Sequence, residues 1–108
     1  MLYELRIYHM HPGRMAAIHK RFSEVTMGLF RRHGIHVCDF WTDADGGERL
    51  YYVCAFADRA EREAAFTAFG ADPDWQNAFA ASHADGPIVE RVESYFMNRV
   101  EYVKPEWK

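Results

Sequence analysis

The sequence predicts an α+β domain of the ferredoxin-like βαββαβ class, in which a four-stranded antiparallel sheet carries helices on one face. Three observations lead to this class. Segments with strand and helix periodicity follow one another in the order strand, helix, strand, strand, helix, helix, strand. An Asp-Gly pair joins the two middle strands as a hairpin. The 108 residues contain no linker and no internal repeat, so we expect one domain over residues 1–108.

The first strand and the first helix have different periods. The segment from residue 2 to residue 9 alternates between two faces, one with Tyr3, Leu5, Ile7 and His9 and the other with Leu2, Glu4, Arg6 and Tyr8. Pro12 and Gly13 precede a helix from Arg14 to about His33, which Gly34 ends. Apolar residues recur along it every three or four positions: Met15, Ile18, Phe22, Val25 and Leu29. Arg21 belongs to the mostly polar set between them.

The hairpin joins strands expected at Ile35–Thr42 and Arg49–Ala57. Its register has two alternatives. A two-residue turn at Asp45-Gly46 places Val37 opposite Cys54, whereas a three-residue loop that also includes Gly47 places Cys38 opposite Cys54. Neither cysteine has zinc-ligand neighbours, so both are interpreted as small apolar residues.

The second half of the chain contains two helices and a strand. Asp58 is a candidate N-cap for a helix that runs to about Phe69, with Ala60, Ala64 and Phe69 facing inward and Arg62 facing solvent. After Gly70 and Pro73, a helix over residues 74–84 presents Trp75 and Phe79. The last strand, residues 88–100, places Val92, Phe96 and Val100 on one face and Glu93, Tyr95, Met97 and Arg99 on the other.

Composition and charge exclude several classes of protein. The net charge of −3 argues against a nucleic-acid binder, and 49% hydrophobic residues argue against disorder. The sequence shows neither a signal peptide nor a membrane span, so we expect a soluble, cytoplasmic protein. The tail around Pro105 and Trp107 is expected to be an extended arm.

The aromatic share of 16% exceeds the need of one small core. Large residues occupy both faces of the predicted strands: Leu2, Tyr8, Phe40, Trp41, Tyr51, Tyr52, Tyr95 and Phe96. Helices cover only one face, and a bare apolar face of this size is unusual in a monomer. We therefore expect a homodimer in which two sheets pack face to face and close into a barrel.

Several motifs give the chain a family resemblance over nearly its whole length. It begins YELRIY at residues 3–8, continues with Pro12-Gly13 and a long helix containing His19 and Phe22, then has FADRAER at residues 56–62, DPDW at residues 72–75 and ESYF at residues 93–96. These features resemble the NIPSNAP family. The resemblance implies a dimeric α/β-barrel, a fold shared with cofactor-free monooxygenases, haem-degrading enzymes and sugar mutarotases. The family has no agreed reaction, and fold does not settle function.

His9 and His19 are the candidate catalytic residues. His9 ends the first strand and His19 lies beside the apolar stripe of the first helix, so we expect both imidazoles to approach one cleft and act as general acid or base. The alternative is that His9 only caps the strand and that His19 is half-exposed. The sequence contains no HExxH motif, phosphate loop or GxSxG elbow, so we expect no metal site.

The candidate ligand-binding residues are Tyr3, Arg6, Trp41 and His36. Arg6 is expected to pair with Glu4, or both with Glu93 and Arg99 on the last strand, in a charged network inside the barrel. That network either fixes the register between subunits or lets Arg6 bind an anion.

Three functions follow from these residues. The first is a small aromatic or polar ligand bound in a helix–sheet cleft, with cofactor-free oxygenase or isomerase chemistry. The second is a non-enzymatic scaffold with a packed dimer interface that includes Tyr8. The third is haem binding, with His9, His19 or His36 as axial ligand.

Overall fold

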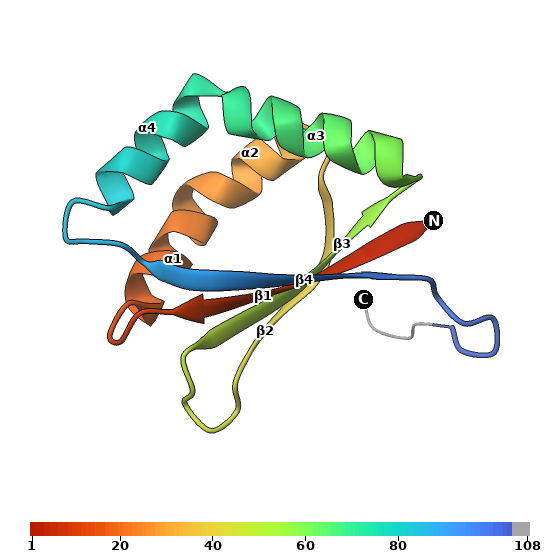
Figure 1. Ribbon diagram of the computed structural model, residues 1–108, viewed down its shortest axis with the longest axis horizontal. Coiled ribbons are helices and arrows are strands. Elements are labelled where there is room, and N and C mark those ends of the chain that lie inside the picture. The colour runs from red at the N-terminus through yellow and green to blue at the C-terminus, as the bar shows by residue number, and fades with distance from the viewer. Residues whose placement is uncertain (105–108) are drawn as a thin grey trace.

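The computed structural model describes residues 1–104 and has the predicted fold, a four-stranded antiparallel sheet with helices on one face (Figure 1). The predicted arm at Pro105 and Trp107 lies outside the described residues. The sheet order is β2-β3-β1-β4. The elements are β1 (Leu2–Met10), α1 (Met15–Arg21), η1 (Phe22–Thr26), α2 (Met27–Arg32), β2 (His36–Thr42), β3 (Arg49–Phe56), α3 (Arg59–Ala71), α4 (Pro73–Ser82) and β4 (Val89–Met97).

The two faces of β1 alternate as predicted, and the charged face is the one beneath the helices. Glu4, Tyr8 and Met10 are buried there. Leu5 and Ile7 therefore lie on the open face of the sheet, which no helix covers. Tyr8 belongs to the core and not to the open face, so the expectation that it contributes to a dimer interface is wrong.

The long first helix extends over nearly the predicted range but contains one π-helical turn, η1, between α1 and α2. Inside this turn the Thr26 hydroxyl donates to the Arg21 carbonyl. The extra residue shifts the apolar repeat, so Thr26 and Phe30 are buried beside Phe22. Arg21 is only 7% exposed, which corrects its expected place among the solvated residues.

Helix α3 begins at the predicted N-cap, where the Asp58 side chain accepts a hydrogen bond from the Glu61 amide. Its inward face differs in part from the prediction. Phe69 is buried as predicted, but Ala60 and Ala64 are exposed and Arg62 turns toward the sheet. Arg62 takes an inward position that an apolar residue would normally occupy, because it forms an ion pair with the buried carboxylate of Glu4 on β1.

The hairpin uses both predicted registers. His36 and Val37 pair with Ala55 and Cys54, the alignment of the two-residue turn, whereas the residues from Asp39 to Thr42 follow the alignment of the longer loop. Cys38 is the extra residue of the bulge between these two parts, so it does not pair with Cys54. Burial raises the pKa of Cys54 to about 12, which makes its thiol inert.

Substituting alanine for two glycines, Gly34 and Gly70, should change the stability in opposite directions. Gly34 follows α2 with φ +72°, a conformation that an L-residue adopts at a cost, whereas Gly70 is helical with open space around its Cα. We expect Gly34→Ala to lower the free energy of unfolding by about 1 kcal/mol and Gly70→Ala to raise it by about 0.5–1 kcal/mol. Urea denaturation measures both. Equal effects of the two substitutions would contradict these backbone conformations.

Candidate functional site

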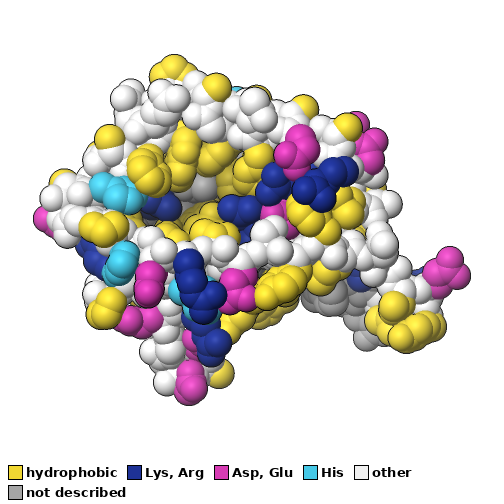
Figure 2. Space-filling view, viewed as in Figure 1, with side chains coloured by type: hydrophobic (Ala, Val, Ile, Leu, Met, Phe, Trp, Pro, Cys, Tyr) yellow, Lys and Arg dark blue, Asp and Glu magenta, His cyan; other side chains and the backbone are white. Residues whose placement is uncertain are grey.

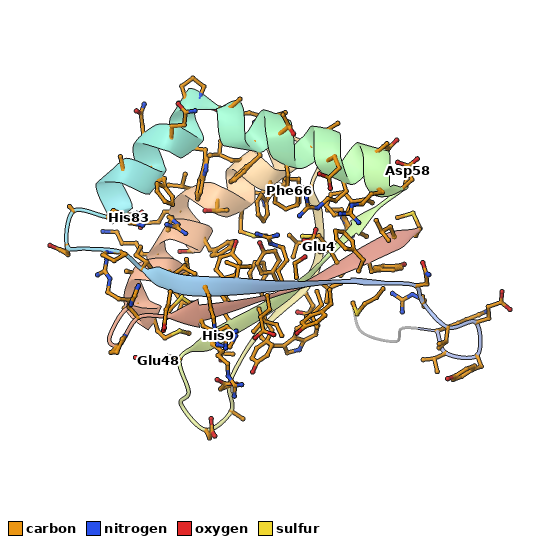
Figure 3. The ribbon with its side chains drawn as sticks, viewed as in Figure 1. Glu4, His9, Glu48, Asp58, Phe66 and His83 are labelled. Atoms are coloured by element: carbon orange, nitrogen blue, oxygen red, sulfur yellow. The ribbon has the colours of Figure 1, made fainter. Side chains whose placement is uncertain are left out.

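A polar network beneath the helices is built on the carboxylate of Glu4, which is fully enclosed. Arg62 of α3 donates to both of its oxygens at 2.8 Å, Arg6 donates at 2.9 Å, and the Ser94 hydroxyl of β4 donates at 2.6 Å. Figure 3 shows Glu4 in the space between α3 and the sheet. The predicted pair of Glu4 and Arg6 is confirmed.

The remaining partners of this pair differ from those expected. Glu93 faces the open side of the sheet, where it pairs with His9, and Arg99 reaches Tyr3. The network therefore lies between the helices and the sheet, and not on the open face of the sheet.

These donors keep Glu4 ionised despite its burial. Desolvation alone would raise the pKa of this carboxyl, but the hydrogen bonds from Arg62, Ser94 and Arg6 outweigh it and lower the pKa to about 2. The guanidinium of Arg6 has further partners, since its Nε donates to the Tyr52 hydroxyl at 2.7 Å. Glu4 thus orients Arg6 toward the aromatic core.

The hydroxyls of Tyr52 and Tyr8 are 3.0 Å apart and continue the chain of hydrogen bonds from Arg6. Tyr52 is completely enclosed, while Tyr8 is 9% exposed. Because a fully enclosed Tyr52 proton needs an acceptor, Tyr52 donates to Tyr8. This order leaves the Tyr8 proton available to a group outside the chain of hydrogen bonds.

A hollow opens beside this network, between α3 and α4 on one side and β4 on the other. Figure 2 shows its hydrophobic walls, with Lys or Arg side chains at its floor. Strand β4 points Val92 and Phe96 toward the helices, but both stay exposed, as does Phe79 on α4 (42%, 37% and 45%). The helix layer therefore leaves part of the inner face of β4 uncovered.

Arg21, the last residue of α1, contacts two aromatic rings of α4. Its guanidinium carbon lies 5.1 Å from the Trp75 ring centre and 5.5 Å from that of Phe79. At the end of α4, the His83 ring stacks on Phe79 with centres 4.1 Å apart, and its Nδ1 bonds to the Phe79 carbonyl. Figure 3 shows His83 at this end of the helix layer.

The predicted catalytic histidines are not brought together. His9 shares the open face with Leu5 and Ile7, and Figure 3 shows it on the side of the sheet away from the helices. His19 is exposed and lines a groove of about 350 Å³ with Phe22 and Phe40. The expectation of a shared cleft is wrong because successive strand residues point to opposite faces, and position 9 has the parity of the open one.

The four predicted ligand-binding residues occupy different places. Tyr3 and Trp41 line one groove of about 340 Å³ on the open face, with Cys38 and Val53. His36 is exposed at the start of β2. Arg6 alone reaches the polar network.

Sequence reasoning missed Arg21, Arg62 and His83 as parts of the site. A signal existed for Arg21, which lies three residues after Ile18 and four before Val25, on the apolar stripe of the helix. Arg62 similarly lies four residues before Phe66.

Two kinds of site are not found in the described part of the chain. No group of three or more His, Cys, Asp or Glu side chains is arranged to hold a metal ion among residues 1–104. Over the same residues, no helix has both the length and the apolar character needed to cross a membrane.

The fold and the hollow together define a ferredoxin-like α+β protein with a polar network beneath its helices. The NIPSNAP family model matches residues 3–104, so the chain belongs to the NIPSNAP family. No curated protein matches the sequence.

Solved structures share the fold over nearly the whole chain. An uncharacterised NIPSNAP domain protein from Burkholderia xenovorans is 24% identical, with a TM-score of 0.83 over 97% of this chain and 100% of its own. A NIPSNAP family protein of unknown function from Agrobacterium tumefaciens is 19% identical, with a TM-score of 0.82 over 95% of this chain and 91% of its own. A putative antibiotic biosynthesis monooxygenase from Nitrosomonas europaea is 14% identical, with a TM-score of 0.64 over 93% of this chain and 99% of its own. At these identities the likeness concerns the fold alone.

The lowered pKa of Glu4 predicts a pH dependence of stability. The ionised Glu4 stabilises the fold fully when the pH is above 4.5, its ordinary pKa, and this stabilisation is lost as the pH falls toward 2. The lowering of the pKa corresponds to about 3 kcal/mol of folding free energy. We expect Glu4→Gln to lower the free energy of unfolding by about 3 kcal/mol at pH 7 and by much less near pH 2. Urea denaturation across this range measures the difference.

The exposed Glu90 on β4 provides the control. Glu90→Gln should follow the wild-type curve at every pH. A constant difference between Glu4→Gln and wild type from pH 7 to pH 2 would show that the carboxylate charge is not what stabilises the fold.

Proposed function

We propose that this NIPSNAP protein binds a small organic ligand in the hollow between α3, α4 and β4. The observation that carries the proposal is a solvent-open space with aromatic walls that ends on a preorganised hydrogen-bonding network. Binding sites for small molecules combine these two features, an apolar lining and a few placed polar groups. The sequence predicted a helix–sheet cleft of this kind, but with other residues.

The walls favour a flat or apolar ligand body. Trp75 packs on Phe69 with ring centres 4.6 Å apart, and Phe66 lies beneath the Arg62 guanidinium at 4.5 Å. Phe79 and Val92 border the opening. Exposed aromatic area of this kind interacts favourably with another ring.

If the hollow is an active site, we propose that it carries out oxygenase or isomerase chemistry without a cofactor. For proton transfer in the hollow, the suitable groups are the Tyr8 hydroxyl and the His83 imidazole, in place of His9 and His19. Since Nδ1 of His83 is engaged by the Phe79 carbonyl, its Nε2 is the basic atom.

The haem ligands expected from the sequence, His9, His19 and His36, do not lie in this hollow. His9 bonds to Glu93 on the open face, and the other two are exposed. Haem is therefore no part of the proposal.

Val92→Trp tests where the ligand binds, because a large side chain at this position fills the hollow from β4. Wild-type protein is titrated with hydroquinone, 1-naphthol, glucose and 1-naphthoate, followed by backbone amide NMR shifts and thermal unfolding. We expect an aromatic compound to bind and Val92→Trp to weaken it by about tenfold or more.

Thr67→Trp on the exposed side of α3 is the matched control and should bind as the wild type does. Binding left intact in Val92→Trp would place the ligand elsewhere. Absence of binding by the whole panel at millimolar concentration would refute the proposal and favour the non-enzymatic scaffold.

We propose further that a second copy of the chain covers the open face of the sheet. Large apolar side chains gather there from three strands: Tyr3, Leu5, Ile7, Val53, Tyr95 and Met97. Tyr95 is 50% exposed and Trp41 is 46% exposed. A bare patch of this kind supports a homodimer. Cytoplasmic location stays a prediction from the sequence.

Ile7→Asp tests the dimer, because it places a charge in the middle of the open face without touching the core. We expect light scattering to give twice the chain mass of 12.6 kDa for the wild type and one chain mass, or aggregate, for the variant. Thr67→Asp on α3 should stay dimeric. A wild type that is monomeric at high concentration would contradict this assignment.

A further inference from the structure

Arg21 is a buried cation without an anionic partner. It is 7% exposed, and no carboxylate of the described residues lies within ion-pair distance of it. Its Nη1 makes one long hydrogen bond, 3.3 Å, to the Ser82 hydroxyl, and its Nε has no hydrogen-bond partner at all. Buried guanidinium groups are nearly always paired, so this one lacks a partner that residues 1–104 do not supply.

Comparison with Arg6 shows how unusual this is. Glu4, Tyr8 and Tyr52 surround Arg6 and hold its pKa above the ordinary value in spite of burial. Burial lowers the pKa of Arg21, with Tyr8 and Tyr52 acting weakly in the other direction. Both groups remain charged, since arginine does not lose its proton in proteins.

The hollow consequently carries an excess of positive charge. Arg6, Arg21 and Arg62 contribute three guanidinium groups, whereas two carboxylates bind them, the enclosed Glu4 and the exposed Glu63. Glu4 is also saturated, because Arg6, Arg62 and Ser94 already occupy its oxygens. It cannot turn to neutralise Arg21.

A second donor is available in the same region. The Tyr52 hydroxyl accepts from Arg6, so we assign it as the donor to the Tyr8 oxygen at 3.0 Å, which leaves the Tyr8 O–H free to donate. Tyr8 packs on Phe22, the residue that follows Arg21, with ring centres 5.8 Å apart, and both Tyr8 and Arg21 are buried. An anion in the hollow would therefore meet a charged N–H and a hydroxyl proton, neither of which has an acceptor among residues 1–104.

We infer that the ligand of the hollow is an aromatic carboxylate whose acid group binds Arg21 and Tyr8 and whose ring packs against Trp75 and Phe79. This inference rests on the proposed function and adds the chemical class of the ligand. A carboxylate suits the site because its two oxygens can accept separately from the guanidinium and from the hydroxyl. The rings next to Arg21 leave an apolar wall for the rest of the molecule.

Comparing carboxylic acids with amides of the same shape tests whether the negative charge of the ligand contributes to binding. Benzoate is compared with benzamide, and 1-naphthoate with 1-naphthamide, by titration calorimetry and amide NMR shifts. The wild type should bind each acid about 10- to 100-fold more tightly than its amide, the range expected for hydrogen bonds to a charged group. In Arg21→Gln this preference should disappear while the weak binding of the amide remains.

Two further variants separate this role from others. Lys20→Gln removes a neighbouring exposed charge and should keep the preference. Ala81→Trp fills the groove of about 320 Å³ between α1 and α4, which Arg21 also borders, and should leave the acid bound. Loss of acid binding in Ala81→Trp but not in Val92→Trp would move the anion to that groove and overturn the assignment.

The outcomes distinguish this inference from the proposed function. Equal binding of acid and amide in the wild type would overturn the carboxylate and leave the hollow as a neutral aromatic site. Binding of inorganic phosphate as tight as that of benzoate would overturn the aromatic part. Where Arg21→Gln fails to fold, Arg21→Lys keeps the charge without the planar fork and should lose most of the preference.

Discussion

The enclosed carboxylate of Glu4 is the constraint on which the rest of the molecule depends. An ion without water is tolerable only when donors surround it, and here the donors come from β1, α3 and β4. This requirement turns Arg62 inward and fixes α3 over one end of β4. The other end of the helix layer is not tied to β4 in this way. The contacts of Glu4 with Arg62 and Ser94 close the space between α3 and β4 at one end. At the other end no such contact holds the helices to β4, and Val92 and Phe79 stay exposed. The hollow is therefore a consequence of where the charge of Glu4 is neutralised.

The same carboxylate also decides which face of the sheet is which. Successive residues of a strand point to opposite sides, so a slip by one residue would move Glu4 to the open face and Leu5 beneath the helices. Burial of apolar residues alone does not choose between these alternatives, because β1 carries large side chains on both parities. Arg62 selects one of them, since only one parity offers it a carboxylate. The apolar open face that remains is what a second copy of the chain is proposed to cover.

Periodicity was sufficient for the fold and insufficient for the site. The order of elements, the Asp58 N-cap and the two faces of β4 follow from the sequence, because each depends on residues that are neighbours along the chain. The side of the sheet that the helices cover depends on contacts between distant residues, and this is why His9 and His19 were expected together. The π-helical turn after Arg21 and the bulge at Cys38 each insert one residue into a regular repeat. A pattern that assumes a constant period does not contain such insertions.

The charge in the hollow says more about chemistry than the fold does. A likeness of 14% identity to a putative monooxygenase concerns the backbone, and a ferredoxin-like sheet supports many unrelated reactions. The side chains are specific to this chain. A buried guanidinium that has no anionic partner among the described residues carries a free-energy cost, which apolar packing at the same position would avoid. Structural need does not explain Arg21, because Glu4, Arg6 and Arg62 already complete their own network without it. A group that arrives from solvent and carries a negative charge removes that cost, and the π-helical turn directly after Arg21 belongs to the class of helix irregularity that is frequent where ligands bind.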